Sequence, residues 1–457
     1  MPQNKTIPVK NEEQTLLLGR ENVGKLLKKF SLPAIAAMIA SSMYNIVDSV
    51  MIGQGVGAMA IAGVAICFPF MNLAAAFGSL VGVGAATVFS IKLGEGDYKT
   101  ARLVLGNVVV LNTIIGLAFT ALTLPFLNPI LRFFGASDAT VGFAYDYMKW
   151  ILICNVFTHI FMGLNGLLRA AGFPNLSMGL TMGSVLLNIP LTYIAIFVMG
   201  MGIEGAAIAT TISQIAATLA SVMVFVKRNK IVYFSKDVFH LRKQIVKDSC
   251  AIGMSPFLMH VAGCLVVIII NHAFQKHGGD FAIGAYGIIN RVSFVFMMVC
   301  FGLMQGMQPI VSYNYGAKQY SRMWHAYKLT VIWATLILAL ACAVCEIFPA
   351  FIAGFFTTDS ELISQCVTGF RYSMLAFPVI AFGMVTTNFF QSTNKPKKSI
   401  FLSLTRQFLF LIPLIIILPQ YFGLLGVWLS LPISDFISTV LAFIFIKREK
   451  RIHYSSL

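Results

Sequence analysis

The chain has 457 residues, of which 58% are apolar and only 11% are charged, and its formal net charge is +16. A soluble domain carries about a quarter charged residues, so this composition excludes a soluble enzyme and a disordered chain and indicates an integral membrane protein. The basic residues lie between apolar stretches. A membrane topology therefore explains the positive charge better than binding to nucleic acid, which we do not expect.

Twelve apolar stretches follow one another along the chain, and each is long enough for a membrane-spanning helix. About 20 helical residues cross the hydrocarbon core, whereas the strands of a membrane barrel are much shorter. We therefore expect an all-α integral membrane protein with twelve transmembrane helices. The stretches are 30–53, 60–91, 101–127, 141–170, 176–199, 203–227, 247–275, 281–314, 322–348, 360–392, 399–419 and 425–447.

Lys and Arg are concentrated on one side of this predicted topology. The two terminal segments and the loops after every second helix, counted with their flanks, contain 28 of the 33 basic residues. Cytoplasmic loops carry such an excess, so we expect a multi-pass protein of the cell (inner or cytoplasmic) membrane with both termini in the cytoplasm. The basic segment between the sixth and seventh helices is expected to lie on anionic lipid headgroups.

The chain repeats itself with an offset of 222 residues. The spacing of Ser90, Gly94 and Tyr98 recurs at that offset, and Gly84 and Pro174 also have counterparts there. Six helices per half is an even number, so both halves enter the membrane from the same side as parallel repeats, and two like halves are suited to rocking. We expect an N-terminal segment 1–29, an N-lobe 30–227, a linker 228–246, a C-lobe 247–447 and a C-terminal tail 448–457.

Asp48 is the acid of the first predicted helix, where a charge costs about 3 kcal/mol at membrane depth and is a functional candidate. Ser41, Asn45 and Asp48 are spaced four and three residues apart, so we expect them on one face of the helix. A lone carboxylate in a medium of low dielectric favours its protonated form. It is therefore suited to taking up and releasing H⁺, or to binding Na⁺ with neutral oxygens. The alternative is a fixed hydrogen-bond anchor between helices.

Polar residues of neighbouring helices are candidates to complete this site. Asn155 belongs to the fourth predicted helix, and Asn188 and Thr192 lie one turn apart on the fifth. Carboxylate, amide and hydroxyl oxygens are hard ligands suited to Na⁺ or to a hydrogen-bonded proton. For each residue alone, a satisfied hydrogen bond between helices is an equal alternative. No metal or other cofactor is expected besides the coupling ion.

A second set of charges is expected in the C-lobe. Arg291, Arg371 and Asp435 each lie about ten residues into their predicted helices, which places them about 15 Å deep at 1.5 Å per residue. We expect a buried cluster of two arginines and one aspartate. It is either a structural salt bridge that locks the lobe or an element that gates or couples transport.

Three segments resemble a known family. They are the first-helix stretch Tyr44–Gly53 (YNIVDSVMIG), the turn Leu168–Pro174 (LRAAGFP) and the stretch Gln305–Lys318 (QGMQPIVSYNYGAK). The chain is similar through nearly its whole length to the MATE (multidrug and toxic compound extrusion) transporters, in particular to their bacterial MepA-like branch. The resemblance implies a V-shaped, two-lobed antiporter that exports cationic or lipophilic compounds in exchange for H⁺ or Na⁺.

The resemblance also assigns residues. The family's first-helix aspartate corresponds to Asp48 and its fifth-helix asparagine to Asn188, whereas Thr192 stands where many relatives have an aspartate. This departure favours H⁺ over Na⁺ as the coupling ion. We expect a monomer whose partners are its small-molecule substrate and membrane lipids.

Two other functions are alternatives. A flippase for lipid-linked sugars or lipids would have the same fold but a cleft with many cationic residues. A membrane-embedded enzyme would need a catalytic pair or metal ligands at membrane depth, and the histidines are too scattered to supply them.

Overall fold

The computed structural model describes residues 10–226, 233–234 and 239–454, and within these ranges its regular secondary structure is all helical, with no strand. The first nine residues of the expected N-terminal segment, parts of the linker 228–246 and the last three residues of the tail lie outside the described residues. Long apolar runs form helices here because a helix satisfies all its backbone hydrogen bonds within one segment. The all-α prediction is confirmed.

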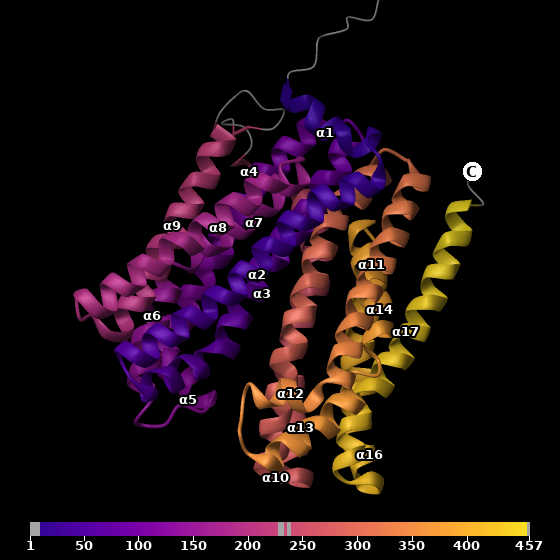
Figure 1. The fold of residues 1–457 in the computed structure, drawn as a ribbon. Coiled ribbons are helices and arrows are strands. Elements are labelled where there is room, and N and C mark those ends of the chain that lie inside the picture. The colour runs from indigo at the N-terminus through magenta and orange to yellow at the C-terminus, as the bar shows by residue number, and fades with distance from the viewer. Residues whose placement is uncertain (1–9, 227–232, 235–238, 455–457) are drawn as a thin grey trace, which may run out of the picture.

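The first group of helices extends from α1 to α9 and is drawn from indigo to magenta in Figure 1. A short helix α1 precedes the first long one, and α2 begins at Val23, seven residues before the apolar stretch does. The bounds are α1 Lys10–Arg20, α2 Val23–Gly55, α3 Ala58–Gly94, α4 Tyr98–Thr123, the 3₁₀ turn η1 Leu124–Phe126, α5 Leu127–Phe133, α6 Val141–Ile153, α7 Asn155–Ala170, α8 Pro174–Tyr193, the π-helical turn η2 Ile194–Val198 and α9 Gly202–Val226.

The second group follows, from orange to yellow. Its helix α10 has 74 residues but changes direction at Gly279, whose φ of 65° lies outside the helical region. The bounds are α10 Lys243–Gly316, α11 Tyr320–Ile347, α12 Pro349–Gly354, α13 Ser360–Ser373, α14 Phe377–Ser392, α15 Pro396–Leu404, the π-helical turn η4 Thr405–Leu411, α16 Ile412–Phe422 and α17 Leu424–Tyr454.

Nine described helices are long and apolar enough to cross a membrane, or up to eleven if each of two bent pairs is one span. The bent pairs are α6–α7, with an angle of 53°, and α13–α14, with 54°. Counting the two segments of α10 on either side of Gly279 separately adds one more. The count of twelve spans rests on helix length and composition, and it stays a prediction.

The helix bounds show the internal repeat. Helix α7 spans Asn155–Ala170 and α14 spans Phe377–Ser392, so both ends differ by 222 residues. Helices α8 and α15 begin at Pro174 and Pro396, which are the same distance apart. The bent pair is thus repeated in the two halves at the offset that the sequence predicts.

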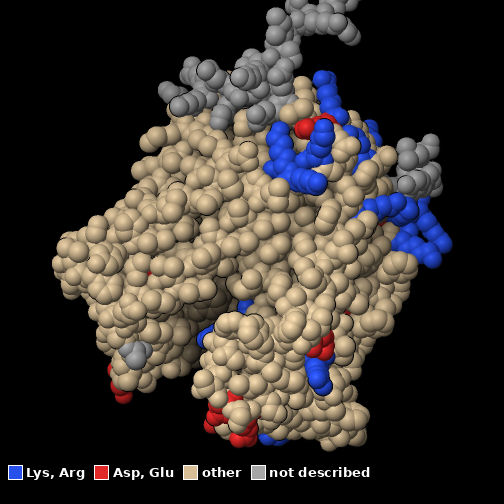
Figure 2. Space-filling view, viewed as in Figure 1, with Lys and Arg blue, Asp and Glu red and all other residues tan. Residues whose placement is uncertain are grey.

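The two groups of helices form a V. They converge at the end of the molecule that carries α1 and the C-terminus and diverge towards α5, α12 and α16 (Figure 1). On the face drawn in Figure 2 most Lys and Arg side chains gather at the convergent end, and a hollow separates the two arms of the V at the other. We call the convergent end the basic end.

Glycines allow the two groups to touch near the basic end. A Cβ at Gly94 would lie 2.0 Å from the carbonyl oxygen of Tyr313, and one at Gly316 would lie 2.2 Å from that of Ile91. Gly94 and Gly316 are 222 residues apart, and so are Ile91 and Tyr313, so each contact is the repeat counterpart of the other. A similar pair lies further along α3, where a Cβ at Gly84 would meet the carbonyl oxygen of Ser249 at 1.8 Å. At such distances any larger residue would force the two groups of helices apart.

Candidate ion-coupling and substrate site

A chain of hydrogen bonds connects α2, α8 and α9 around Asp48. The Thr192 hydroxyl lies 3.5 Å from Oδ1 of Asp48 and 3.2 Å from Oδ1 of Asn188. The Asn188 amide donates to Oγ1 of Thr210 at 3.1 Å, and the hydroxyl of Tyr44 lies 2.9 Å from the same oxygen. The structure therefore brings together three of the expected residues, Asp48, Asn188 and Thr192.

The local sequence explains this arrangement. Tyr44 and Asp48 are four residues apart on α2, and Asn188 and Thr192 are four apart on α8, so each pair shares one helix face. The sequence also offers Thr210 as one of three polar residues of the sixth predicted helix that could complete the site, and it assigns no role to Tyr44. The four-residue spacing from Asp48 is the signal that would have found Tyr44.

Asp48 is a buried acid without a basic partner. Asp48 is 6% exposed, and among the described residues no Lys, Arg or His lies within ion-pair distance of its carboxylate. A buried ionised carboxylate without a counter-charge is costly, and one long hydrogen bond offsets little of that cost. The group is therefore suited to binding a proton, or to holding a small cation with the neutral oxygens of Asn188 and Thr192.

Two of the expected residues lie elsewhere. Asn45 is exposed, and its amide donates to the carbonyl of Ser41 on its own helix at 2.9 Å. Three residues correspond to 300° around a helix, so Asn45 is turned about 60° from Asp48, which is enough to leave the site. Asn155 is buried at the start of α7, directly after the bend between α6 and α7, and its amide nitrogen has no partner. No described contact joins either residue to Asp48.

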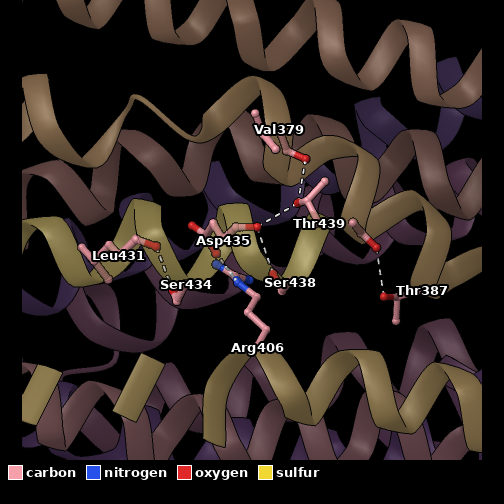
Figure 3. Close-up of polar contacts among 9 residues, drawn as sticks. Val379, Thr387, Arg406, Leu431, Ser434, Asp435, Ser438 and Thr439 are labelled. Atoms are coloured by element: carbon pink, nitrogen blue, oxygen red, sulfur yellow. Dashed lines mark hydrogen bonds and ion pairs between the residues drawn. The ribbon is translucent and has the colours of Figure 1, made fainter. Parts of the chain in front are cut away.

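The expected C-lobe cluster is corrected. Asp435 of α17, which is 5% exposed, pairs with Arg406 of the π-helical turn η4, with 2.5 Å between Nε and Oδ1. Figure 3 shows the Arg406 side chain extending to Asp435. Arg291 and Arg371 are exposed, and neither forms an ion pair with Asp435 in the part of the chain that the structure describes.

The position of Arg406 explains the error. Arg406 lies near the start of the predicted helix 399–419, and from the sequence it is counted only among the basic residues of the cytoplasmic side. Helix α15 begins at Pro396, so Arg406 lies ten residues, or about 15 Å, inside the span. The same depth is expected for Arg291 and Arg371, but equal depth does not determine which way a side chain points. The hydroxyls of Ser438 and Thr439 donate to the carbonyl oxygen of Asp435 rather than to its carboxylate (Figure 3).

Replacing Arg406 with methionine is expected to destabilise the protein by about 1–3 kcal/mol, because it leaves Asp435 buried without a counter-charge. The lower half of this range is favoured because the Arg406 side chain is 36% exposed. The double variant Arg406→Met with Asp435→Leu should recover most of the loss. Thermal unfolding of the purified protein measures both effects.

The matched control is Arg132→Met, which removes a pair with Asp138 whose side chains are 50% and 91% exposed. It should change stability by less than about 0.5 kcal/mol. Equal losses for Arg406→Met and for the double variant would show that the unpaired carboxylate of Asp435 is not what destabilises the single variant.

A cavity of about 230 Å³ lies between the two arms of the V. Residues of α2, α3, α7 and α8 line it on one side, and Gln305, Gln308 and Pro309 of α10 line it on the other. The Gln308 amide crosses between the arms, where it donates to Oγ1 of Thr87 at 2.8 Å. The cavity is a place where one ligand would contact both groups of helices.

Comparisons with known proteins agree with this architecture. The sequence model of the MatE family matches residues 33–194 and 251–417. The chain is 28% identical over 435 residues to the multidrug export protein MepA of Staphylococcus aureus (strain MSSA476), covering 95% of this chain and 96% of MepA. It is also 28% identical over 431 residues to MepA of Staphylococcus haemolyticus (strain JCSC1435), covering 94% and 95%.

Solved structures give the same result. The MATE multidrug transporter DinF-BH is 34% identical and has a TM-score of 0.87, covering 95% of this chain and 98% of that one. An outward-facing multidrug resistance MATE transporter of the MOP superfamily has a TM-score of 0.91 at 24% identity, covering 96% and 98%. The second likeness concerns the fold alone.

Proposed function

Because the chain belongs to the MatE family, we propose that this multi-pass membrane protein is an antiporter that exports cationic or lipophilic drugs and toxic compounds in exchange for H⁺ or Na⁺. The relatives named as multidrug export proteins and transporters support the class of cargo. The observation that carries the coupling mechanism is Asp48, a buried acid with no basic partner among the described residues and one weak hydroxyl donor.

We propose that the basic end faces the cytoplasm and the hollow faces outwards. The concentration of Lys and Arg at the basic end in Figure 2 supports this orientation, because cytoplasmic loops of membrane proteins carry the excess of basic residues. In this proposal both termini lie in the cytoplasm, and the protein lies in the cytoplasmic (inner) membrane. One chain supplies both arms of the V, which supports a monomer.

The mechanism follows from a difference in affinity between two states. An ion shifts the equilibrium between outward-open and inward-open forms only if it binds one of them more tightly. In the outward-open form Asp48 takes up an ion and the substrate leaves the hollow. Neutralising the carboxylate removes the cost of burying a charge, and this gain lets the arms close on the outer side.

H⁺ is the coupling ion that we favour. Within hydrogen-bond distance Asp48 has one described hydroxyl, that of Thr192, and that hydroxyl also contacts Asn188. A proton needs only the carboxylate, whereas Na⁺ needs a shell of several oxygens in the same place.

Substrate flux into vesicles tests the proposal. The purified protein is reconstituted into liposomes, and uptake of a fluorescent cationic dye is followed with a pH gradient alone and with a Na⁺ gradient alone. We expect the pH gradient to drive accumulation and the Na⁺ gradient to drive less. Accumulation under neither gradient, at normal protein incorporation, would contradict coupled export.

A further inference from the structure

The cavity between the arms contains a basic side chain that the proposed mechanism does not use. Arg169 lies in the last turn of α7 and lines this cavity. One of its N–H groups donates to Oγ of Ser177 at 3.1 Å, and no described acidic residue lies within ion-pair distance of it. A guanidinium carries five N–H donors, and one described hydrogen bond uses only a small part of this capacity.

The surroundings of Arg169 do not supply a counter-charge. Ser177 donates onward to the amide oxygen of Asn165, and the Asn165 amide donates to Oγ1 of Thr181 at 2.9 Å. These three side chains are neutral and form hydrogen bonds with one another. Helix α8 begins at Pro174, so the positive end of its dipole lies near Ser177. Arg169 itself lies in the last turn of α7, where the negative end of that helix dipole offsets part of its charge, and no described acidic side chain neutralises the rest.

A second unsatisfied group lines the same cavity. Ser90 of α3 is 1% exposed, and its hydroxyl oxygen has no hydrogen-bond partner among the described residues. Helices α3 and α7 pack closely and in parallel, because Gly82 lies against Gly163 and Gly166 against Ala86. One further turn along both helices brings Ser90 level with the last turn of α7, where Arg169 lies. The cavity thus offers a cationic fork and a free hydroxyl donor at the same height.

We propose that this cavity binds the carboxylate group of a transported compound, with Arg169 and Ser90 as donors. Arginine matches the two oxygens of a carboxylate with parallel N–H bonds. A purely cationic end would be repelled here, so a zwitterionic amphiphile would place its carboxylate at Arg169 and its cationic part away from it. This inference rests on the proposed export function and assigns to this cavity the residues that bind the carboxylate of such a compound.

A small carboxylate tests the site without any transport. Benzoate, and neutral benzamide as its matched control, are titrated into the purified full-length protein at constant ionic strength, and thermal unfolding is followed. We expect benzoate to raise the Tm of the wild type and benzamide to leave it unchanged. Arg169→Gln, which keeps a polar side chain but removes the charge, should lose the benzoate shift, and Arg169→Lys should keep part of it.

A matched pair of dyes tests the substrate class. One dye is a cationic rhodamine ethyl ester, and the other is the corresponding free acid, which is a zwitterion. Fluorescence anisotropy gives their Kd values. Arg169→Gln should weaken binding of the acid by about tenfold or more, because it removes a charge-assisted hydrogen bond, and should change binding of the ester less than about twofold.

Two further variants keep the result decisive. Ser90→Ala removes the hydroxyl and keeps the charge of Arg169, so it tests the proposal even if Arg169→Gln does not fold. It should weaken binding of the acid dye by about threefold to tenfold. The exposed Arg132→Gln should change neither dye. The proposal would be overturned if the ratio of the Kd values for the acid and the ester dye were unchanged in both cavity variants. It would also be overturned if benzoate still raised the Tm of Arg169→Gln. Failure of both dyes to bind counts against the export function, while the benzoate result still decides the carboxylate site.

Discussion

Vesicles that contain the Asp48→Asn variant are expected to accumulate no substrate above the level of protein-free vesicles. Asparagine has nearly the shape of aspartate but neither a charge nor a titratable proton. The side chain at position 48 is therefore uncharged in both the outward-open and the inward-open form. An ion that binds neither form cannot shift the equilibrium between them. The expected loss of gradient-driven flux is about tenfold or more, measured as initial rates under a pH gradient.

Stability separates this result from misfolding. Asp48 is buried without a counter-charge among the described residues, so neutralising it should leave the Tm of the purified protein unchanged or higher. Binding of the dye in the absence of a gradient should also persist.

The matched control is Asp138→Asn. It makes the same change at an acid whose side chain is 91% exposed, and it should keep full flux. Energised accumulation by Asp48→Asn at the wild-type rate would remove Asp48 from the mechanism.

Much of the architecture could be predicted from the sequence because lipid restricts the choice of fold. Long apolar stretches in a membrane form helices, and the 222-residue repeat fixes the correspondence between the two halves. The repeat even relates the helices that follow the bends, since α7 and α14 share its offset. Hydropathy does not detect the bend itself, because α6 and α7 are apolar on both sides of it. Hydropathy does separate the two segments of α10, because the predicted stretches 247–275 and 281–314 lie on either side of Gly279, where the backbone has a positive φ.

The candidate site was predictable where helical spacing carries the information. Asn188 and Thr192 share a face of α8, and the structure places both beside Asp48. Spacing within one helix does not say how that helix is rotated against its neighbours. Asn45 is therefore expected in the site although it faces away, and Asp435 is expected beside two arginines of suitable depth instead of Arg406. The role of Asp48 in coupling stays a prediction.

A methyl group at Gly84 is expected to open the basic end of the molecule. A Cβ there would lie 1.8 Å from the carbonyl oxygen of Ser249, and a Cβ at Gly253 would lie 1.7 Å from that of Leu80. A backbone carbonyl cannot rotate away as a side chain can, so Gly84→Ala and Gly253→Ala force α3 and α10 apart. Overpacking of this kind costs about 1–3 kcal/mol.

The cost falls only on the form in which the basic end is closed, so the substitutions change a population rather than the fold. A penalty of about 1–3 kcal/mol lowers the ratio of closed to open forms by about 5-fold to 150-fold. Hydrogen–deuterium exchange should then be faster at the ends of α3 and α10, where Gly94 and Gly316 contact the opposite arm.

Gly179→Ala in α8 is the matched control, because no described atom lies within 4 Å of a Cβ at that position. It makes the same chemical change, favours the helix slightly since alanine is the better helix former, and should leave exchange at α3 and α10 unchanged. If Gly84→Ala exchanged as slowly as Gly179→Ala, the contact between α3 and α10 would not be what holds the basic end closed. Faster exchange in both Gly84→Ala and Gly253→Ala, together with slowed flux, would identify close backbone packing at these glycines as the inner gate of alternating access.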